Sequence, residues 1–143
     1  MALEQLVGLP SLEDTTAAVR QAVAQIAEEA GRIVPGVRWQ DVGVDAVEDC
    51  EKPYDGTEGQ QHQLPAKVAE GVAVSGAQWA QIEAAARRMA AVAGAPTAVL
   101  VRNVPGSHEI SFVGQAGLSI TIGYRGSLVI AGRTGCRLPA SRM

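Results

Sequence analysis

Large apolar residues recur at every second position near the C-terminal end of the sequence. The positions are Leu118, Ile120, Ile122 and Tyr124. A period of two places one face of a strand on a core and the other face in water. Arg125 and Gly126 then form a turn, and an apolar run returns the chain toward Cys136. The pattern predicts a β-hairpin over residues 118–136.

Two longer stretches repeat their apolar residues every three or four positions, which is the period of an amphipathic helix. The first follows the capping residue Ser11 and ends before Pro35. The second follows Ser75 and Gln78, which have the spacing of a capping box, and ends at Gly94. We expect helices over residues 11–34 and 77–93. Their apolar stripes are Leu12, Thr16, Val19, Val23, Ile26, Ala30 and Ile33, and Trp79, Ile82, Ala86, Met89, Ala90 and Ala93.

The remaining segments have weaker patterns. Residues 2–9 predict a short helical turn, and residues 37–47 predict a strand whose change of phase requires a bulge near residues 40–43. The polar residues 48–63 predict the longest loop, with Tyr54 folding back. Residues 64–74 read as an edge strand or an irregular segment because Pro65 and Gly71 interrupt them. Residues 97–103 and 109–113 predict two strands around a Pro-Gly turn.

The order of these elements predicts the fold class. Helix, strand, strand, helix and a meander of strands indicate an α+β two-layer sandwich, with two helices packed on one face of an antiparallel sheet. A length of 143 residues fits a single domain over residues 1–143. Only 3% of the residues are aromatic, so the core must consist mainly of aliphatic side chains such as Ile26 and Ile120.

The charge balance excludes one class of partner. A net charge of -3 and a pI near 5.3 argue against nucleic-acid binding, which usually requires a basic surface. No apolar stretch reaches the length of a membrane span, and the first ten residues lack the basic and apolar regions of a signal peptide. We expect the chain as given to be soluble.

Cys50 and Cys136 are the only cysteines. They lack the spacing and the neighbouring histidines of a zinc site or a redox motif. We expect a disulfide, because neither cysteine occupies an expected core position. Two buried free thiols remain the alternative, as is common in cytosolic proteins.

Acidic residues are concentrated between positions 41 and 58. They are Asp41, Asp45, Glu48, Asp49, Glu51, Asp55 and Glu58. The spacing lacks the regular ligand positions of an EF-hand, so a solvated acidic face is favoured and no metal site is predicted. Because Arg133 and Arg137 flank Cys136, a disulfide would bring them near Glu48, Asp49 and Glu51 as exposed ion pairs.

No catalytic residue and no cofactor site are predicted. Ser107, His108 and Glu109 are consecutive and point in different directions, whereas triads are assembled in space. The familiar motifs of hydrolases, nucleotide-binding proteins and zinc proteases are missing. His62 and His108 fall in expected turns or loops, where we expect solvated side chains. Trp39 and Trp79, which could stack on a ligand, lie on apolar faces and are expected in the core.

Several short motifs resemble the LppA-like lipoproteins of mycobacteria over nearly the whole chain. They are PSLEDTT at residues 10–16, the strand with Trp39, Cys50 followed by Tyr54-Asp55-Gly56, and Gly135-Cys136-Arg137. The resemblance implies a precursor with a signal peptide and lipobox, acylated on its mature N-terminal cysteine and held at the outer face of the cell membrane. This sequence has no lipobox and no N-terminal cysteine, so a membrane anchor is implied for the precursor alone. No established activity comes with the family.

We therefore expect a non-enzymatic cell-envelope lipoprotein domain, a binding or interaction module with a protein or lipid partner in the envelope. One alternative is a carrier of lipid or another apolar ligand, with helix 78–93 opening away from the sheet. A carrier requires a continuous apolar cavity of roughly 300 Å³ or more. A further alternative is an enzyme with an unfamiliar site, which requires convergent polar groups in a cleft.

Overall fold

The computed structural model describes residues 2–143. The helices are α1 (Ala2–Val7), α2 (Leu12–Ile33) and α3 (Gly76–Val92), with short 3-10 turns η1 (Gln115–Gly117) and η2 (Ala140–Arg142). The strands are β1 (Gln40–Val42), β2 (Ala46–Asp49), β3 (Gln60–Gln63), β4 (Ala66–Ala69), β5 (Thr97–Val104), β6 (Ser107–Val113), β7 (Ser119–Tyr124) and β8 (Leu128–Arg133).

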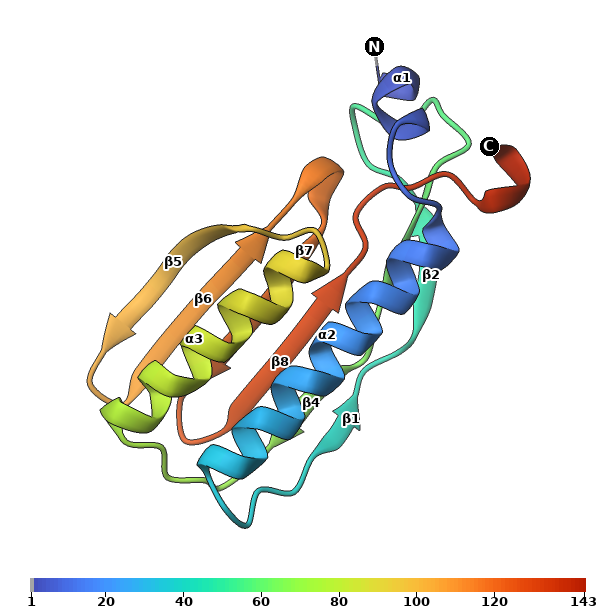
Figure 1. Cartoon of the computed structure of the whole chain (residues 1–143). Helices are drawn as coiled ribbons and strands as arrows, with labels where there is room; N and C mark the ends of the chain where they lie inside the picture. The colour runs from blue at the N-terminus through green and yellow to red at the C-terminus, as the bar shows by residue number, and fades with distance from the viewer. Residues whose placement is uncertain (1) are drawn as a thin grey trace.

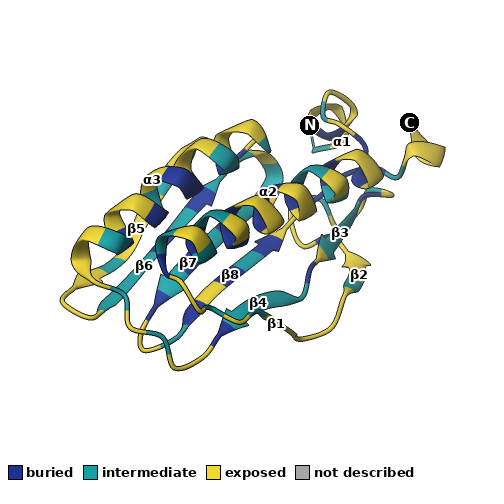
Figure 2. Cartoon of the chain, turned by 60° about the horizontal axis from the view of Figure 1, so that its bottom comes forward, coloured by how far each residue is buried: buried dark blue, intermediate teal, exposed yellow. Residues whose placement is uncertain are grey.

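Helices α2 and α3 lie side by side on one face of an antiparallel sheet (Figures 1 and 2). The described strands follow the order β1-β4-β8-β7-β6-β5, and the β2–β3 hairpin joins this sheet where β3 pairs with β8. Helix α2 packs on β8, whereas α3 packs on β6 and β7. This arrangement confirms the predicted α+β two-layer sandwich.

The ends of both long helices are those expected from the sequence. The Ser11 side chain accepts a hydrogen bond from the Asp14 N–H at 3.0 Å, which caps the first turn of α2. Ser75 and Gln78 form a reciprocal capping box at the start of α3. Gly94 follows α3 with a φ of +98°, a conformation that glycine adopts without strain.

The main core lies between the helix layer and the sheet. The four alternating residues of the predicted hairpin are all buried, and Ile122 pairs directly with Ile130 across β7 and β8. A Cβ at Gly132 would lie 2.6 Å from a Val19 methyl group, so the absence of a side chain lets α2 approach β8 closely. Buried residues face inward on both layers (Figure 2).

The region between α2 and α3 differs from the expectation. Residues 37–47 form parts of two strands rather than one bulged strand, because the chain turns through Gly43, whose φ is +100°. The predicted loop over 48–63 is shorter, since β2 extends to Asp49 and β3 begins at Gln60. β2 is mostly exposed and β3 consists of partly buried polar residues, so backbone pairing rather than apolar burial defines these two strands.

Pro65 and Gly71 led us to expect an edge strand or an irregular segment over residues 64–74, but β4 lies inside the sheet. It pairs with β8 on one side and with β1 on the other, so β1 forms that edge of the sheet. Pro65 precedes the strand and Gly71 follows it, so neither interrupts the hydrogen-bonded residues Ala66–Ala69.

A second, smaller core surrounds the Cys50–Cys136 disulfide at the end of the molecule where α1 and η2 lie (Figure 1). Leu6 of α1 and Leu138 pack against the two cysteines. Both cysteines are buried, contrary to the expectation of non-core positions, because α1 covers them. Tyr54 folds back as expected, and its hydroxyl donates to the Gln5 amide oxygen at 2.7 Å.

Candidate functional site

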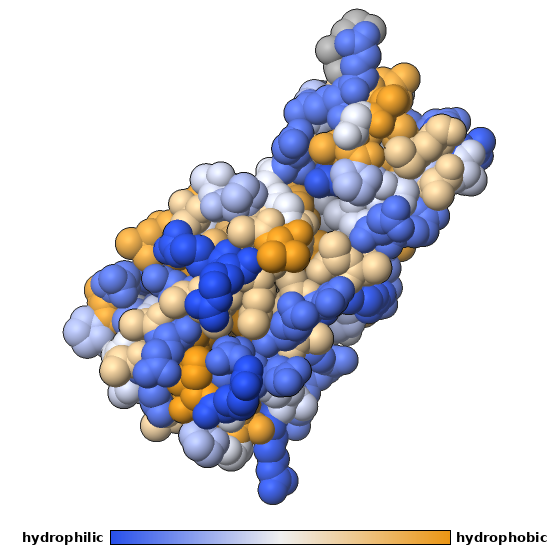
Figure 3. Space-filling model, viewed as in Figure 1, coloured by the Kyte–Doolittle hydropathy of each residue, from blue (hydrophilic) through white to orange (hydrophobic). Residues whose placement is uncertain are grey.

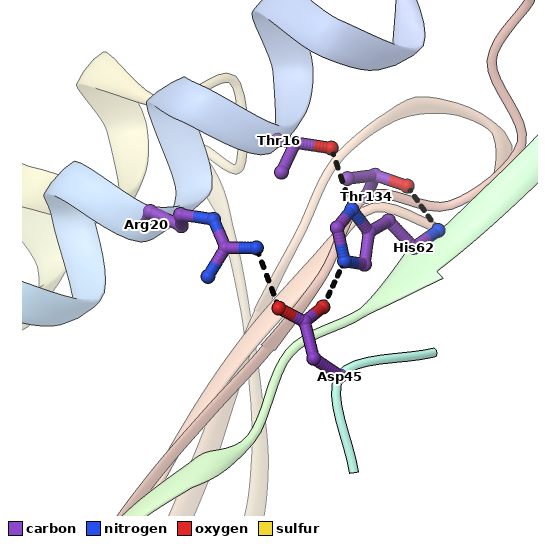
Figure 4. Close-up of polar contacts among 5 residues, drawn as sticks. All are labelled: Thr16, Arg20, Asp45, His62 and Thr134. Atoms are coloured by element: carbon purple, nitrogen blue, oxygen red, sulfur yellow. Dashed lines mark hydrogen bonds and ion pairs between the residues drawn. The ribbon is translucent and has the colours of Figure 1, made fainter. Parts of the chain in front are cut away.

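A cluster of polar side chains connects α2 with the β2–β3 hairpin (Figure 4). Thr16 and Arg20 lie one turn apart on α2. Asp45 precedes β2, His62 lies in β3, and Thr134 follows β8. The register of the hairpin, in which Ala46 faces Gln63, brings Asp45 beside His62. We call these five residues the Asp45–His62 cluster.

The histidine is held on three sides. Its Nε2 contacts Asp45 Oδ1, and its Nδ1 lies 3.1 Å from the Thr16 hydroxyl oxygen. Its backbone N–H donates to Thr134 Oγ1 at 2.9 Å. An ionised carboxylate only accepts hydrogen bonds, so a neutral His62 carries its proton on Nε2 and accepts from Thr16 at Nδ1. Asp45 therefore selects both the tautomer and the ring orientation.

Arg20 completes the cluster from the helix side. Its Nη2 atom donates to Asp45 Oδ2 at 2.8 Å. This hydrogen bond, followed by that from His62, holds the pKa of Asp45 below its ordinary value of 3.8. Asp45 is consequently ionised at neutral pH, and its carboxylate bridges the helix and the hairpin.

The linear order of carboxylate, imidazole and hydroxyl matches the order of a catalytic triad. Acyl transfer also needs hydrogen-bond donors aimed at the developing oxyanion. Thr16 lies beyond the first turn of α2, where backbone N–H groups are used in the helix itself, so the helix offers no such donors beside the hydroxyl. Both oxygens of Asp45 are also occupied, one by His62 and one by Arg20.

A groove of about 520 Å³ runs beside the cluster, between the first turns of α2 and the β2–β3 hairpin. We call it the α2–β2 groove. Its apolar lining residues are Leu12, Ala17, Val47 and Pro139, and its polar ones are Glu13, Thr16, Arg20, Gln60 and His62. Val47 is half exposed there although it belongs to a strand. The groove thus combines an apolar wall with a polar rim.

The histidines occupy strands and not the expected turns or loops. His62 lies in β3, and His108 lies in β6, where its ring stacks on Trp79 with centroids 4.9 Å apart. Nδ1 of His108 is 2.8 Å from the Asn103 side-chain oxygen. The expected loop positions were wrong, because β3 is entirely polar and β6 begins at Ser107, two residues before the strand expected over residues 109–113. Both histidines are partly buried.

Ser107, His108 and Glu109 do not form a triad. Ser107 Oγ accepts from Arg102 Nε at 2.5 Å, and Glu109 lies near the same guanidinium group at 3.7 Å. The tryptophans differ from each other. Trp79 is buried as expected, whereas Trp39 is only half buried and donates from its indole to the Ala27 carbonyl oxygen.

The acidic residues between 41 and 58 are dispersed over the surface. Asp41 pairs with Lys67 and Glu58 with Arg142, while Asp45 joins the cluster described above. Within residues 2–143, no group of three or more His, Cys, Asp or Glu side chains is arranged to hold a metal ion.

The predicted ion pairs beside the disulfide are wrong. Arg133 donates to the Ser119 hydroxyl, and Arg137 turns inward and donates to the backbone carbonyl oxygens of Gln115 and Cys136. Arg137 is buried, so its guanidinium does not reach the exposed acidic residues Glu48, Asp49 and Glu51.

The sequence contained a partial indication of the cluster. Thr16 and Arg20 are four residues apart and therefore share a helix face. Asp45 and His62 could not be added, because only the pairing of β2 with β3 places them together.

Comparisons with known proteins agree with this fold. The family LppA, described as "Lipoprotein confined to pathogenic Mycobacterium", matches residues 1–140. No curated protein matches. The helices of residues 2–143 include none that is long and apolar enough to cross a membrane.

Two solved structures are similar in fold. The putative lipoprotein LppA from Mycobacterium tuberculosis has 16% sequence identity and a TM-score of 0.65, covering 92% of this chain and 80% of that chain. A DUF4853 family protein from Actinomyces odontolyticus ATCC 17982 has 14% sequence identity and a TM-score of 0.63. The match covers 96% of this chain and 74% of that chain. Because the family match extends over nearly the whole sequence, this chain belongs to the LppA family of lipoproteins.

Proposed function

We propose that this chain is a non-enzymatic binding domain of a cell-envelope lipoprotein, and that a protein partner docks in the α2–β2 groove. In this proposal the native protein is held at the outer face of the cell membrane by a lipid anchor. Membership of a lipoprotein family supports the association with the envelope.

The observation that carries the proposal is the composition of the groove. Its apolar residues lie beside polar groups that already satisfy one another within the Asp45–His62 cluster. Protein interfaces have this anatomy, with an apolar centre and a hydrogen-bonded polar rim. An apolar side chain of a partner would remove Val47 from water without breaking the cluster.

Enzymatic activity is the weaker proposal. The aligned Thr16 hydroxyl favours it, but a nucleophile there has no oxyanion donors from its own helix. Binding needs no such donors, and the salt-bridged cluster is suited to holding the hairpin in position against α2.

A carrier of an apolar ligand was expected to hold that ligand between the helix layer and the sheet. Small residues on α3, including Ala86 and Ala90, are fully buried there and permit close packing. A different pocket, between the start of α2 and the C-terminal end of α3, supports this second candidate function. Arg137 is among the residues that line it.

Site-specific crosslinking in the native envelope tests the proposed docking site. A photoreactive residue is introduced at Val47 in the groove and, as a control, at Val104 on β5 at the far side of the sheet. The two positions are matched, with 50% and 52% of the residue exposed. We expect a discrete protein adduct at Val47 alone, which Ala17→Glu in the groove abolishes. Equal adducts at both positions, or none at Val47, would contradict the proposal.

A further inference from the structure

Arg137 is a buried charge without a counterion in residues 2–143. The residue is 3% exposed, and both of its hydrogen bonds come from Nη1, at 3.0 Å to the Gln115 carbonyl oxygen and 2.7 Å to that of Cys136. Its Nε atom is buried and has no hydrogen-bond partner among the described residues. Burial also lowers the pKa of the guanidinium. Buried charges are ordinarily paired, so an anionic partner would stabilise this guanidinium.

Arg137 also lines a pocket of about 360 Å³. Its lining residues come from the start of α2, the C-terminal end of α3 and the segments beside them. Figure 1 shows where these two helix ends lie, and Figure 3 shows apolar side chains between the two helices. Most of the other lining residues are apolar or small: Leu9, Pro10, Ala18, Val92, Ala93 and Leu118. This volume is within the range of small-molecule sites.

We propose that this pocket binds an amphipathic monocarboxylate, with the carboxylate on Arg137 and the hydrocarbon part against the apolar walls. A planar guanidinium matches the geometry of a carboxylate and forms charge-assisted hydrogen bonds with it, and both described hydrogen bonds of Arg137 come from Nη1 and leave Nη2 for a ligand. The ligand would thereby supply the partner that the protein itself lacks.

The charges around the pocket favour one orientation of the ligand and a ligand with a single negative charge. The positive end of the α2 dipole lies on the Arg137 side, whereas the C-terminal end of α3 at Val92 carries the negative end of its dipole. An anionic head is therefore favoured near Arg137 and an apolar tail near Val92. Asp14 also lines the pocket, and its carboxylate disfavours ligands with more than one negative charge.

This site is separate from the α2–β2 groove. Asp14, Thr15 and Ala18 face the pocket, whereas Thr16, Ala17 and Arg20 face the groove on another side of the same helix. The inference deepens the second candidate function, carriage of an amphipathic molecule. It does not depend on a protein partner at Val47.

Isothermal titration of the whole chain with decanoate, below its micelle concentration, tests the proposal. We expect one decanoate per chain and at least tenfold weaker binding of decanol, which has the same chain length but no charge. Arg137→Met is expected to weaken decanoate binding at least tenfold, whereas Arg133→Met, at an arginine outside the pocket, leaves it unchanged. Equal affinity for decanol, equal loss in both variants, or no binding to the unmodified chain overturns the proposal.

A second variant decides the matter if Arg137→Met fails to fold. Ala18→Leu fills the pocket from α2 and leaves Arg137 and the disulfide core intact. We expect it to retain the melting temperature of the unmodified chain and to lose decanoate binding. A folded Ala18→Leu chain that binds decanoate with unchanged affinity overturns the proposal. The crosslinking result at Val47 is independent of either outcome.

Discussion

Gly135 occupies a position that no other residue fits. Its φ is +66°, and an added Cβ would lie 2.3 Å from the Leu118 backbone nitrogen and 2.4 Å from the Ala116 carbonyl oxygen. This close approach lets the Cys136 N–H donate to Ala116 at 2.8 Å, which positions the disulfide. The glycine therefore determines how the C-terminal segment reaches the small core.

We predict that Gly135→Ala lowers the free energy of unfolding by more than about 2 kcal/mol, because backbone strain and backbone contacts add. Urea denaturation measures the loss. Gly126→Ala is the matched control, since Gly126 has a φ of +72° and open space around its Cα. The control should cost about 1 kcal/mol from the left-handed conformation alone. Equal losses in the two variants would show that the contacts at Gly135 are unimportant.

Asp45 makes the stability of the hairpin contact depend on pH. Its pKa is lowered by the Arg20 and His62 hydrogen bonds, so the folded chain binds this proton more weakly than the unfolded chain. The carboxylate therefore stabilises the fold above about pH 3.8, and this contribution is lost as the pH falls through the lower folded-state pKa.

We predict that Asp45→Asn lowers the melting temperature at neutral pH and that the difference from the unmodified chain disappears well below pH 3.8. The effect is small, since the side chains of Arg20 and Asp45 are both substantially exposed. Asp55→Asn, at an exposed loop carboxylate, is the control and should show no such pH-dependent difference. A difference for Asp45→Asn that persists at low pH would contradict the assignment.

At the scale of elements, the helices and strands with a regular apolar period are those that the sequence predicts. Helices α2 and α3 and the β7–β8 hairpin each bury a regular stripe, and the structure confirms all three. Strands β1 and β2 consist of three and four mostly exposed residues, so no alternation indicates them. The backbone of β1 pairs with β4 and that of β2 pairs with β3, and backbone pairing places little constraint on which residues occur there.

The packing of the two layers predicts the cost of core substitutions. Ile26 on α2 is 1% exposed, and Ile120 on β7 is 0% exposed. Ile26→Ala and Ile120→Ala should each lower the free energy of unfolding by about 2–5 kcal/mol through lost transfer energy and a residual cavity. Chemical denaturation measures both. Val92→Ala, at a residue 90% exposed, should stay within about 0.5 kcal/mol of the unmodified chain. Unchanged stability in both isoleucine variants would refute the packing.

At the scale of the whole molecule, the disulfide connects the small core to the sheet. Cys50 follows β2 and Cys136 follows β8, at a sequence separation of 86. The chain-entropy model gives about 4–5 kcal/mol for a loop of this length. Leu6 and Leu138 pack on the same residues, so this end of the molecule depends on the covalent link.

We predict that reduction lowers the melting temperature and releases α1 and the C-terminal segment before the helix–sheet core. Hydrogen exchange with and without reductant measures the order, because local opening exposes amides in proportion to local stability. Intact-mass measurement after alkylation provides the control for the redox state. Two alkylated cysteines without reductant would mean free thiols and would also weaken the proposed extracytoplasmic location.

The sequence alone determined the two helices, the C-terminal hairpin and the two-layer α+β class, because each depends on local periodicity and capping at Ser11 and Ser75. It also indicated the family through short motifs. Only the tertiary structure decided which side chains meet across the chain. Asp45 reaches His62 through strand register, and Arg137 turns inward to donate to the carbonyl oxygens of Gln115 and Cys136. Such contacts depend on long-range pairing, on which the spacing of residues along the sequence carries no information.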